Sequence, residues 1–170
     1  DICDTLITRP LLDPENTKHW IAKRINCKHY PERRHAAETS LREAGSTDVS
    51  LAHICTEYVR LFGTAEGDAR QLQSIEESVE LALVQPLPGM IEILGTAKQA
   101  GKKVVLASDM FLSSDAIGKM LQKCNVLEYD ALYISSEVGV RKSTGALFRH
   151  IAESEGILPE QAVMIGDHPI

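Results

Sequence analysis

Four side chains that can do chemistry are far apart in the sequence: Asp1, Ser108, Lys142 and Asp167. Each of them adjoins a short segment with strand-like or loop character. A carboxylate can act as a nucleophile and form an acyl-phosphate intermediate. Two carboxylates, Asp1 and Asp167, can hold one Mg²⁺, which prefers oxygen ligands and keeps several waters. The Ser108 hydroxyl can bind phosphate oxygens, and the Lys142 ammonium can neutralise charge that builds up in the transition state. The four residues together indicate nucleophilic attack on an anionic substrate beside a metal ion.

A parallel sheet would bring these residues to one edge. Short apolar runs at 103–107, 131–134 and 162–165 predict strands that are about 30 residues apart, the length of a βαβ unit. Apolar residues at helical spacing predict intervening helices over 90–100, 113–121 and 144–155. Residues 1–6 are expected to end an earlier strand. Because ligands bind beyond the carboxyl ends of parallel strands, the polar residues that follow the runs should meet there.

Residues 12–88 differ from the rest of the chain, because they contain few strand candidates. Apolar spacing predicts four helices there, which are centred on residues 20–25, 36–43, 51–62 and 75–83. We expect Trp20 and Tyr58 to lie in the core of this helical insert, and Glu76, Glu77 and Glu80 to form a solvated helix face. The Pro- and Gly-rich segment 85–89 marks the return to the alternating pattern.

Composition narrows the class of protein. The 170 residues include 18 Lys and Arg against 24 Asp and Glu, which gives a net charge of −6, and no basic cluster suggests a nucleic-acid partner. No apolar run approaches the roughly 20 residues that span a bilayer. The four cysteines form no CxxC pair, so reduced thiols in a cytoplasm are the expectation. The chain starts without Met, and we expect both ends to be cut from a longer sequence.

The order of these motifs resembles that of the haloacid dehalogenase (HAD) superfamily. The segment Asp-Ile-Cys-Asp-Thr-Leu at 1–6 is similar to the first HAD motif, Leu-Ala-Ser-Asp at 106–109 to the second, Lys142 to the third, and Ile-Gly-Asp at 165–167 to the fourth. The wording of the motifs also resembles predicted HAD hydrolases that are associated with, or fused to, bacterial glycosyltransferases. Each motif alone is weak, but the four in this order are specific.

The resemblance implies an α/β fold, a Rossmann-like parallel sheet with an inserted helical cap. Residues 1–11 and 89–170 would form the core, and residues 12–88 the cap. It implies a Mg²⁺-dependent hydrolase, a phosphatase that acts on a small phosphorylated metabolite through an aspartyl-phosphate. The implied roles are nucleophile for Asp1, catalytic and phosphate-binding cation for Lys142, phosphate or substrate binding for Thr5, Ser108 and Asp109, and metal binding for Asp1, Asp167 and the backbone carbonyl of Cys3.

The sequence departs from the phosphatase pattern at Cys3. Family phosphatases carry an acid/base Asp there, and a thiol is a poor substitute for a carboxylic acid in protonating an ester oxygen. Two alternatives therefore stay open: a catalytically weak HAD-like module of a larger glycosyltransferase or polysaccharide-assembly protein, and a dehalogenase- or phosphonatase-like enzyme that needs no acid at this position. Asp109 either binds substrate or caps a loop. Arg9 and Arg141 are expected at the surface rather than on a substrate, and Asp4 should point away from the site.

Overall fold

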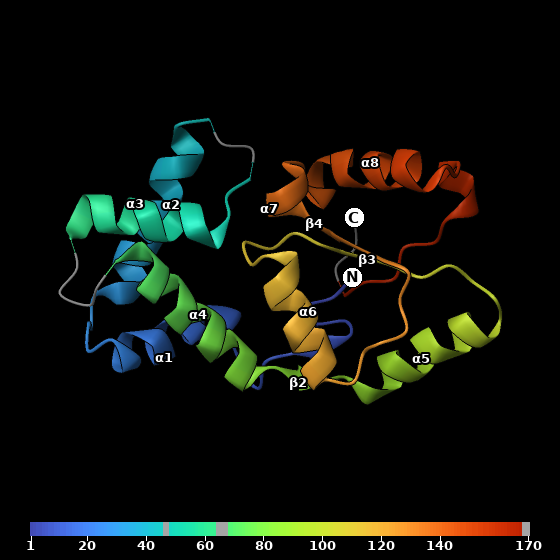
Figure 1. The fold of residues 1–170 in the computed structure, drawn as a ribbon, viewed down its shortest axis with the longest axis horizontal. Helices are drawn as coiled ribbons and strands as arrows, with labels where there is room; N and C mark the ends of the chain where they lie inside the picture. The colour runs from blue at the N-terminus through green and yellow to red at the C-terminus, as the bar shows by residue number, and fades with distance from the viewer. Residues whose placement is uncertain (46–47, 64–67, 168–170) are drawn as a thin grey trace.

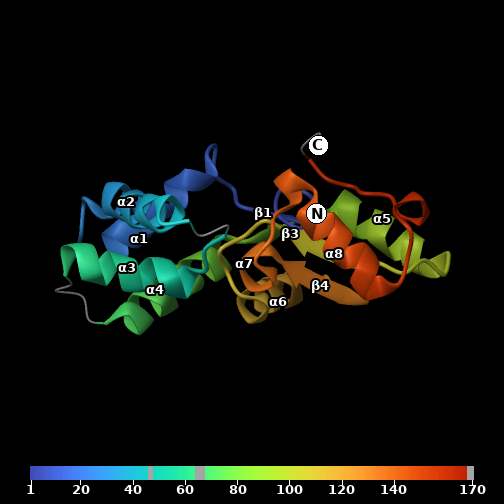
Figure 2. The ribbon, with the colours of Figure 1, turned by 90° about the horizontal axis from the view of Figure 1, so that it is seen from above.

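The computed structural model describes residues 1–45, 48–63 and 68–167. Its elements form two groups that lie next to one another along the longest axis of the molecule (Figures 1 and 2). Four helices, α1 to α4, make up one group, and the other contains a small parallel sheet with helices α5 to α8 around it. The predicted α/β core with an inserted helical cap is therefore confirmed. The exact cap boundaries at 12 and 88 stay predictions.

The cap helices are α1 (Thr17–Arg24), α2 (Tyr30–Glu43), α3 (Leu51–Phe62) and α4 (Ala69–Leu83), preceded by a short 3₁₀ helix at Pro14–Asn16. The side chain of Ser50 caps α3 by accepting from the backbone N–H of His53, and Asp68 caps α4 in the same way. Helix α2 starts earlier than the apolar pattern predicts, because Pro31 in its first turn has no N–H to lose.

The cap core contains charge as well as apolar side chains. Glu76 is buried, contrary to the predicted solvated face, and accepts from Arg34 at 3.1 Å and from the hydroxyl of Tyr30. Glu80 is also buried and pairs with Arg9. These partners lie on other segments, which is why the composition of α4 alone misplaces both carboxylates. Tyr58 is buried as predicted, whereas Trp20 is half exposed.

Two extended segments join the cap to the core. Strand β1 (Ile7–Thr8) pairs antiparallel with β2 (Gln85–Pro86), so the chain leaves and re-enters the core at one place. Figure 2 shows this connection between the two groups of helices. The pairing explains how a cap of four helices is attached at a defined position beside the first motif.

The core sheet consists of β3 (Val105–Ser108) and β4 (Ala131–Ile134), which pair in parallel with Ser108 opposite Ile134. Helix α6 (Ser114–Lys123) crosses between them and buries Ile117 and Leu121. The remaining core helices are α5 (Pro88–Gln99), α7 (Ser135–Val138) and α8 (Ala146–Glu155), with short 3₁₀ turns at Lys142–Thr144 and Pro159–Gln161. The predicted strands at 103–107 and 131–134 and the three predicted helices are thus present, with small shifts of their ends.

The predicted third strand at 162–165 is wrong for the part of the chain that the structure describes. The segment forms no strand there: its backbone hydrogen bonds are a turn bond from the N–H of Ala162 to the carbonyl oxygen of Pro159 and one bond from the amino nitrogen of Asp1 to the carbonyl oxygen of Ile165, at 2.8 Å. A strand needs a ladder of such bonds with a neighbour. Val163 is 88% exposed as a result. The apolar run predicted burial, but the described backbone supplies no paired strand to bury it.

Residues 1–6 form a tight turn rather than a continued strand. The carbonyl oxygen of Ile2 accepts from the backbone N–H groups of Leu6 and Ile7, and Asp4 adopts the left-handed conformation with φ of 55°. Its exposed carboxylate accepts a hydrogen bond from the Thr8 hydroxyl at 2.7 Å. Asp4 therefore shapes the turn and does not reach toward Asp1, as the sequence predicted.

This geometry makes a prediction for stability. Asp4→Ala should lower the free energy of unfolding by about 1 kcal/mol relative to Asp4→Gly, because a Cβ penalises the left-handed conformation. Both variants lose the hydrogen bond to Thr8. The difference between their free energies of unfolding therefore reports the cost of the left-handed backbone conformation at position 4. Asp4→Asn should be close to wild type. Urea denaturation measures the three values, and an alanine variant as stable as the glycine variant would contradict the strain argument.

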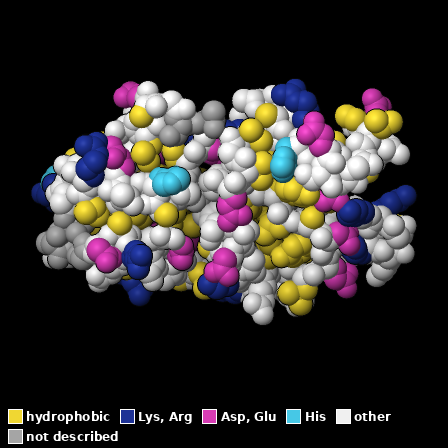
Figure 3. Space-filling model, turned by 45° about the horizontal axis from the view of Figure 1, so that its top comes forward, with side chains coloured by type: hydrophobic (Ala, Val, Ile, Leu, Met, Phe, Trp, Pro, Cys, Tyr) yellow, Lys and Arg dark blue, Asp and Glu magenta, His cyan; other side chains and the backbone are white. Residues whose placement is uncertain are grey.

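Among the residues described, no helix combines the length and the hydropathy needed to cross a bilayer. Charged side chains of both signs are interspersed over the face that Figure 3 shows, with apolar side chains exposed between them.

Candidate active site

The carboxylate of Asp1 lies against the ammonium of Lys142. Lys142 Nζ is 2.7 Å from Asp1 Oδ2, and Asp1 Oδ1 accepts from the backbone N–H of Ile2 at 2.7 Å. Both side chains are largely buried, with exposed fractions of 12% for Asp1 and 15% for Lys142. The chain thus folds so that residues 141 positions apart form a charge-assisted contact, which holds the carboxylate in one orientation.

The loop that carries Lys142 is held by Asp109. Asp109 Oδ1 accepts from the backbone N–H of Lys142 at 2.8 Å, and Asp109 Oδ2 lies 3.8 Å from Arg141 Nε. Asp109 directly follows β3, so the strand end fixes the loop after β4. Of the two roles considered for Asp109, loop capping is the one that these contacts support.

Burial changes the acidity of Lys142. Its pKa is lowered, mainly because burial disfavours the charged ammonium, although Asp109, Asp167 and Cys3 act in the opposite direction. Because burial disfavours the charged form, keeping Lys142 protonated costs free energy, and a nearby anion offsets that cost. A bound anionic group in addition to Asp1 would provide this compensation.

Asp167 reaches the same region through Gly166. A Cβ at Gly166 would lie 3.3 Å from Cβ of Asp1, so a side chain there would press on the proposed nucleophile. Asp167 is close enough to interact electrostatically with Lys142 and with the amino group of Asp1. The structure therefore brings Asp1, Lys142 and Asp167 together.

Cys3 and Ser108 lie next to the cluster of Asp1, Lys142 and Asp167. Ser108, at the end of β3, is buried, and its hydroxyl faces the Cys3 thiol. Burial raises the pKa of Cys3, while Arg9 and Ser108 lower it by smaller amounts. Thr5 is buried under the turn, and its hydroxyl has no hydrogen-bond partner among the described residues. Of these residues, Ser108 and Cys3 adjoin the cluster, and the roles predicted for Ser108 and Thr5 stay predictions.

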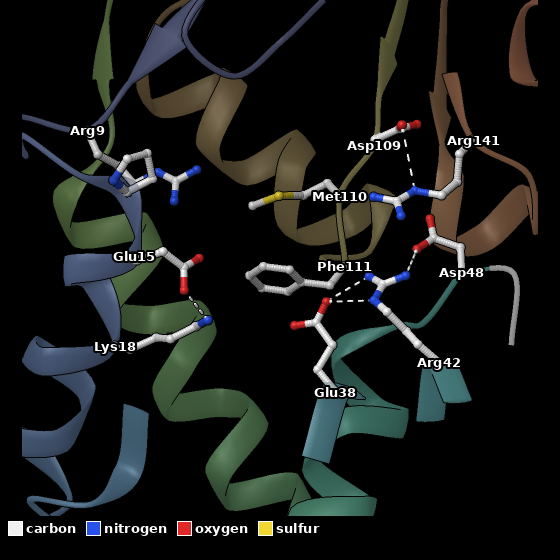
Figure 4. A pocket seen from close by; sticks show the side chains of 11 residues that line it. Arg9, Glu15, Lys18, Glu38, Arg42, Asp48, Asp109, Met110, Phe111 and Arg141 are labelled. Carbon is white, nitrogen blue, oxygen red and sulfur yellow. Dashed lines mark hydrogen bonds and ion pairs between the residues drawn. The ribbon is translucent and has the colours of Figure 1, made fainter. Parts of the chain in front are cut away.

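A polar pocket of about 260 Å³ opens between the cap and the core beside Asp109 (Figure 4). We call it the cap–core pocket. Arg9 and Arg141 both line it; the Arg141 side chain is 38% exposed, as a surface role predicts, whereas that of Arg9 is 13% exposed. Its other lining residues are Pro14, Glu15, Lys18, Glu38, Arg42, Asp48, Asp109, Met110 and Phe111.

Sequence reasoning missed Arg9 and Glu80 as parts of this region. The Arg9 side chain is only 13% exposed and pairs with the buried Glu80 at 3.5 Å. A signal was present on α4, where Glu76 and Glu80 share a helical stripe with Leu72 and Val79. Acidic residues at stripe positions indicate buried partners rather than a solvated face.

The Asp1–Lys142 contact predicts a loss of activity when Lys142 is replaced by an apolar residue. Lys142→Met should lower kcat by about 100-fold or more, since it removes a cation beside developing charge. It should also lower the free energy of unfolding, because it leaves the largely buried Asp1 carboxylate without the ammonium that contacts it at 2.7 Å. Steady-state kinetics and urea denaturation test both halves. Lys119→Met, at an exposed ion pair, is the control, and a wild-type kcat in Lys142→Met would contradict the assigned role.

Comparisons with known proteins show the family and the fold of the chain. A family model described as haloacid dehalogenase-like hydrolase matches residues 3–169. Among solved structures, a dehalogenase with an intermediate complex superposes with a TM-score of 0.53 at 14% identity, over 88% of this chain and 68% of that one. A defluorinating L-2-haloacid dehalogenase gives a TM-score of 0.52 at 16% identity, over 85% of this chain and 62% of that one.

At such identities the two structures show a shared fold and nothing finer about the substrate. The chain spans only about two thirds of the length of these two enzymes. The comparison with curated proteins finds no significant match. The family model covers nearly the whole chain, from the first-motif turn to the residues after Asp167. The chain therefore belongs to the haloacid dehalogenase-like hydrolases.

Proposed function

We propose that this hydrolase is a phosphatase for a small phosphorylated metabolite, with Asp1 as the nucleophile. The observation that carries the proposal is the cap–core pocket, whose lining contains four cations and four carboxylates; one of these carboxylates, Asp109, also holds the loop of Lys142. A pocket of this polarity suits a charged, hydroxyl-rich substrate better than a small apolar one.

The proposed reaction has two steps. Asp1 Oδ attacks the phosphorus atom, and the bond to the leaving oxygen breaks, so the phosphoryl group passes to the carboxylate. Water then cleaves the acyl phosphate and regenerates Asp1. Lys142 stays within reach of Asp1 throughout and offsets charge on the phosphoryl oxygens. Ser108 is proposed to bind one of those oxygens, and Asp109 to hold Lys142 in place.

The residues present fit a magnesium ion. Asp1 and Asp167 both lie close enough to Lys142 to interact with it, and one or two carboxylates plus substrate oxygens and waters are the usual environment of Mg²⁺. We propose these two side chains and the carbonyl oxygen of Cys3 as the protein ligands. When bound, the ion would reduce repulsion between the Asp1 carboxylate and an anionic substrate. Among the residues described, no third acidic, His or Cys side chain completes a cluster with them.

Cys3 supports a second candidate, hydrolysis of a carbon–halogen bond. A halide leaves as a stable anion and needs no proton, so the absence of a carboxylic acid at position 3 has no cost for this reaction. The two dehalogenases that share the fold are consistent with this candidate. The polar lining of the cap–core pocket is the reason that we place it second.

The test is product release from the purified protein. Sugar phosphates, nucleotides and a chromogenic phosphate ester are assayed for phosphate, and short 2-haloacids for halide, with Mg²⁺ and with excess chelator. The proposal expects phosphate release that the chelator abolishes. Halide release without phosphate release would replace it with the second candidate. No release from a folded protein would favour the catalytically weak module. The predicted cytoplasmic location and association with a glycosyltransferase stay predictions.

A further inference from the structure

Arg9 stands between the cap–core pocket and the first motif. Its guanidinium interacts with the Cys3 thiol on one side, pairs with Glu80 of α4 through Nε, and lines the pocket on the other side. Figure 4 shows the Arg9 side chain extending toward the interior of the pocket. Arg9 is therefore a cation that lies next to position 3 and also reaches the pocket.

Arg9 differs from the other cations of the pocket in its partner. Lys18 pairs with Glu15, Arg42 with Glu38 and Asp48, and Arg141 with Asp109, and all of these carboxylates line the pocket themselves. Within the described residues, the ion-pair partner of Arg9 is Glu80, which does not line the pocket. The positive charge of Arg9 is thus the one that the pocket wall does not itself balance.

Position 3 supplies no carboxylic acid, so the leaving oxygen departs with its electron pair and without a proton from that residue. A guanidinium cannot supply the proton either, because it stays charged, but its N–H groups donate hydrogen bonds to an oxyanion. A leaving group that is a stable anion suits this arrangement, whereas an alkoxide does not.

We propose that the substrate is a phosphoanhydride, of the nucleoside-diphosphate or pyrophosphate type, and that Arg9 binds the departing phosphate oxygen. This inference rests on the proposed phosphatase function and narrows its substrate class. In the step itself, the bond from phosphorus to the Asp1 oxygen forms and the bond to the bridging oxygen breaks. The electron pair goes to the departing phosphate, which leaves hydrogen-bonded to Arg9 and takes any proton from solvent afterwards.

The experiment is a leaving-group series. The kcat/KM for phosphate release is measured with substituted phenyl phosphates of graded leaving-group acidity, with pyrophosphate and with ethyl phosphate, for the wild type and Arg9→Gln. We expect the wild type to prefer pyrophosphate to ethyl phosphate. Arg9→Gln should lose about 100- to 1000-fold with the most basic leaving groups and progressively less as the leaving group becomes more acidic. Arg9→Lys should restore part of that dependence.

Two controls separate charge stabilisation from damage to the fold. Lys18→Gln removes another pocket cation that is equally buried, at 13% exposure, and should keep the wild-type leaving-group dependence. The double variant Arg9→Gln/Glu80→Gln removes the unpaired buried carboxylate and should reproduce the steep dependence of Arg9→Gln.

An equal loss across the whole series, or a wild-type preference for ethyl phosphate, would overturn the role of Arg9 and leave the phosphatase proposal standing. No phosphate from any compound in the series, from a folded wild-type protein with Mg²⁺, would overturn both.

Discussion

Asp1→Asn should abolish hydrolysis, with a loss in kcat of at least about 10⁴-fold. The amide oxygen of Asn is uncharged and a far weaker nucleophile, so the first bond to the substrate cannot form at a useful rate. The substitution preserves size, and the amide oxygen can still accept from the ammonium of Lys142, which the carboxylate contacts at 2.7 Å. The folded structure should therefore persist, and steady-state product release should report a chemical loss.

Asp4→Asn is the matched control for this experiment. It makes the same chemical change three residues away, at a carboxylate that is exposed and bonded to Thr8 instead of Lys142. Asparagine tolerates the positive φ of this position. Asp4→Asn should keep kcat within a few-fold of wild type. If the two variants lost activity equally, or if Asp1→Asn retained it, Asp1 would not be the nucleophile.

Arg34→Met should lower the free energy of unfolding by about 3–5 kcal/mol. The Arg34 side chain is fully buried and donates to Glu76 at 3.1 Å and to Glu38 at 3.0 Å, with its guanidinium over the ring of Phe111. Glu76 is itself buried and accepts a hydrogen bond from the hydroxyl of Tyr30. Removal of the cation leaves a carboxylate in the cap core with too little compensation, and urea denaturation measures the cost.

The control is an ion pair of similar geometry on the surface. Arg60→Met breaks a 2.7 Å contact with Glu57, but the Arg60 side chain is mostly exposed and Glu57 keeps the hydrogen bond from Ser40, so the unfolding midpoint should fall far less than in Arg34→Met. In Arg34→Met/Glu76→Gln, removal of the buried carboxylate should recover part of the stability. An Arg34→Met variant as stable as Arg60→Met would show that the buried cluster does not hold the cap together.

The site motifs could be predicted because their placement follows from regular structure. Parallel strands place their carboxyl ends at one edge, so a period of about 30 residues is sufficient to group Ser108 with the loop of Lys142. The role of Asp109 as the cap of that loop needed coordinates, since both carboxylate functions are open from the sequence alone.

The misplaced residues share a different cause. Glu80 and Arg9 are partners across 71 positions, and neither residue carries a local sign of the other. The helical stripe of α4 indicates that Glu80 is buried, but which cation meets it depends on how the cap packs on the core, and periodicity does not encode that. The 162–165 segment shows the converse: its apolar composition predicts a strand, but a strand exists only where a neighbouring backbone pairs with it.

The covalent intermediate is the most direct test of the central claim that Asp1 attacks the substrate. The protein is mixed with Mg²⁺ and excess of its best phosphorylated substrate, quenched in acid, and its intact mass is measured at once. The account predicts a population of wild-type protein that is heavier by one phosphoryl group, located by fragmentation to Asp1 and absent from Asp1→Asn. Phosphoryl transfer to another residue, or steady phosphate release with an intermediate that forms equally in Asp1→Asn, would contradict it.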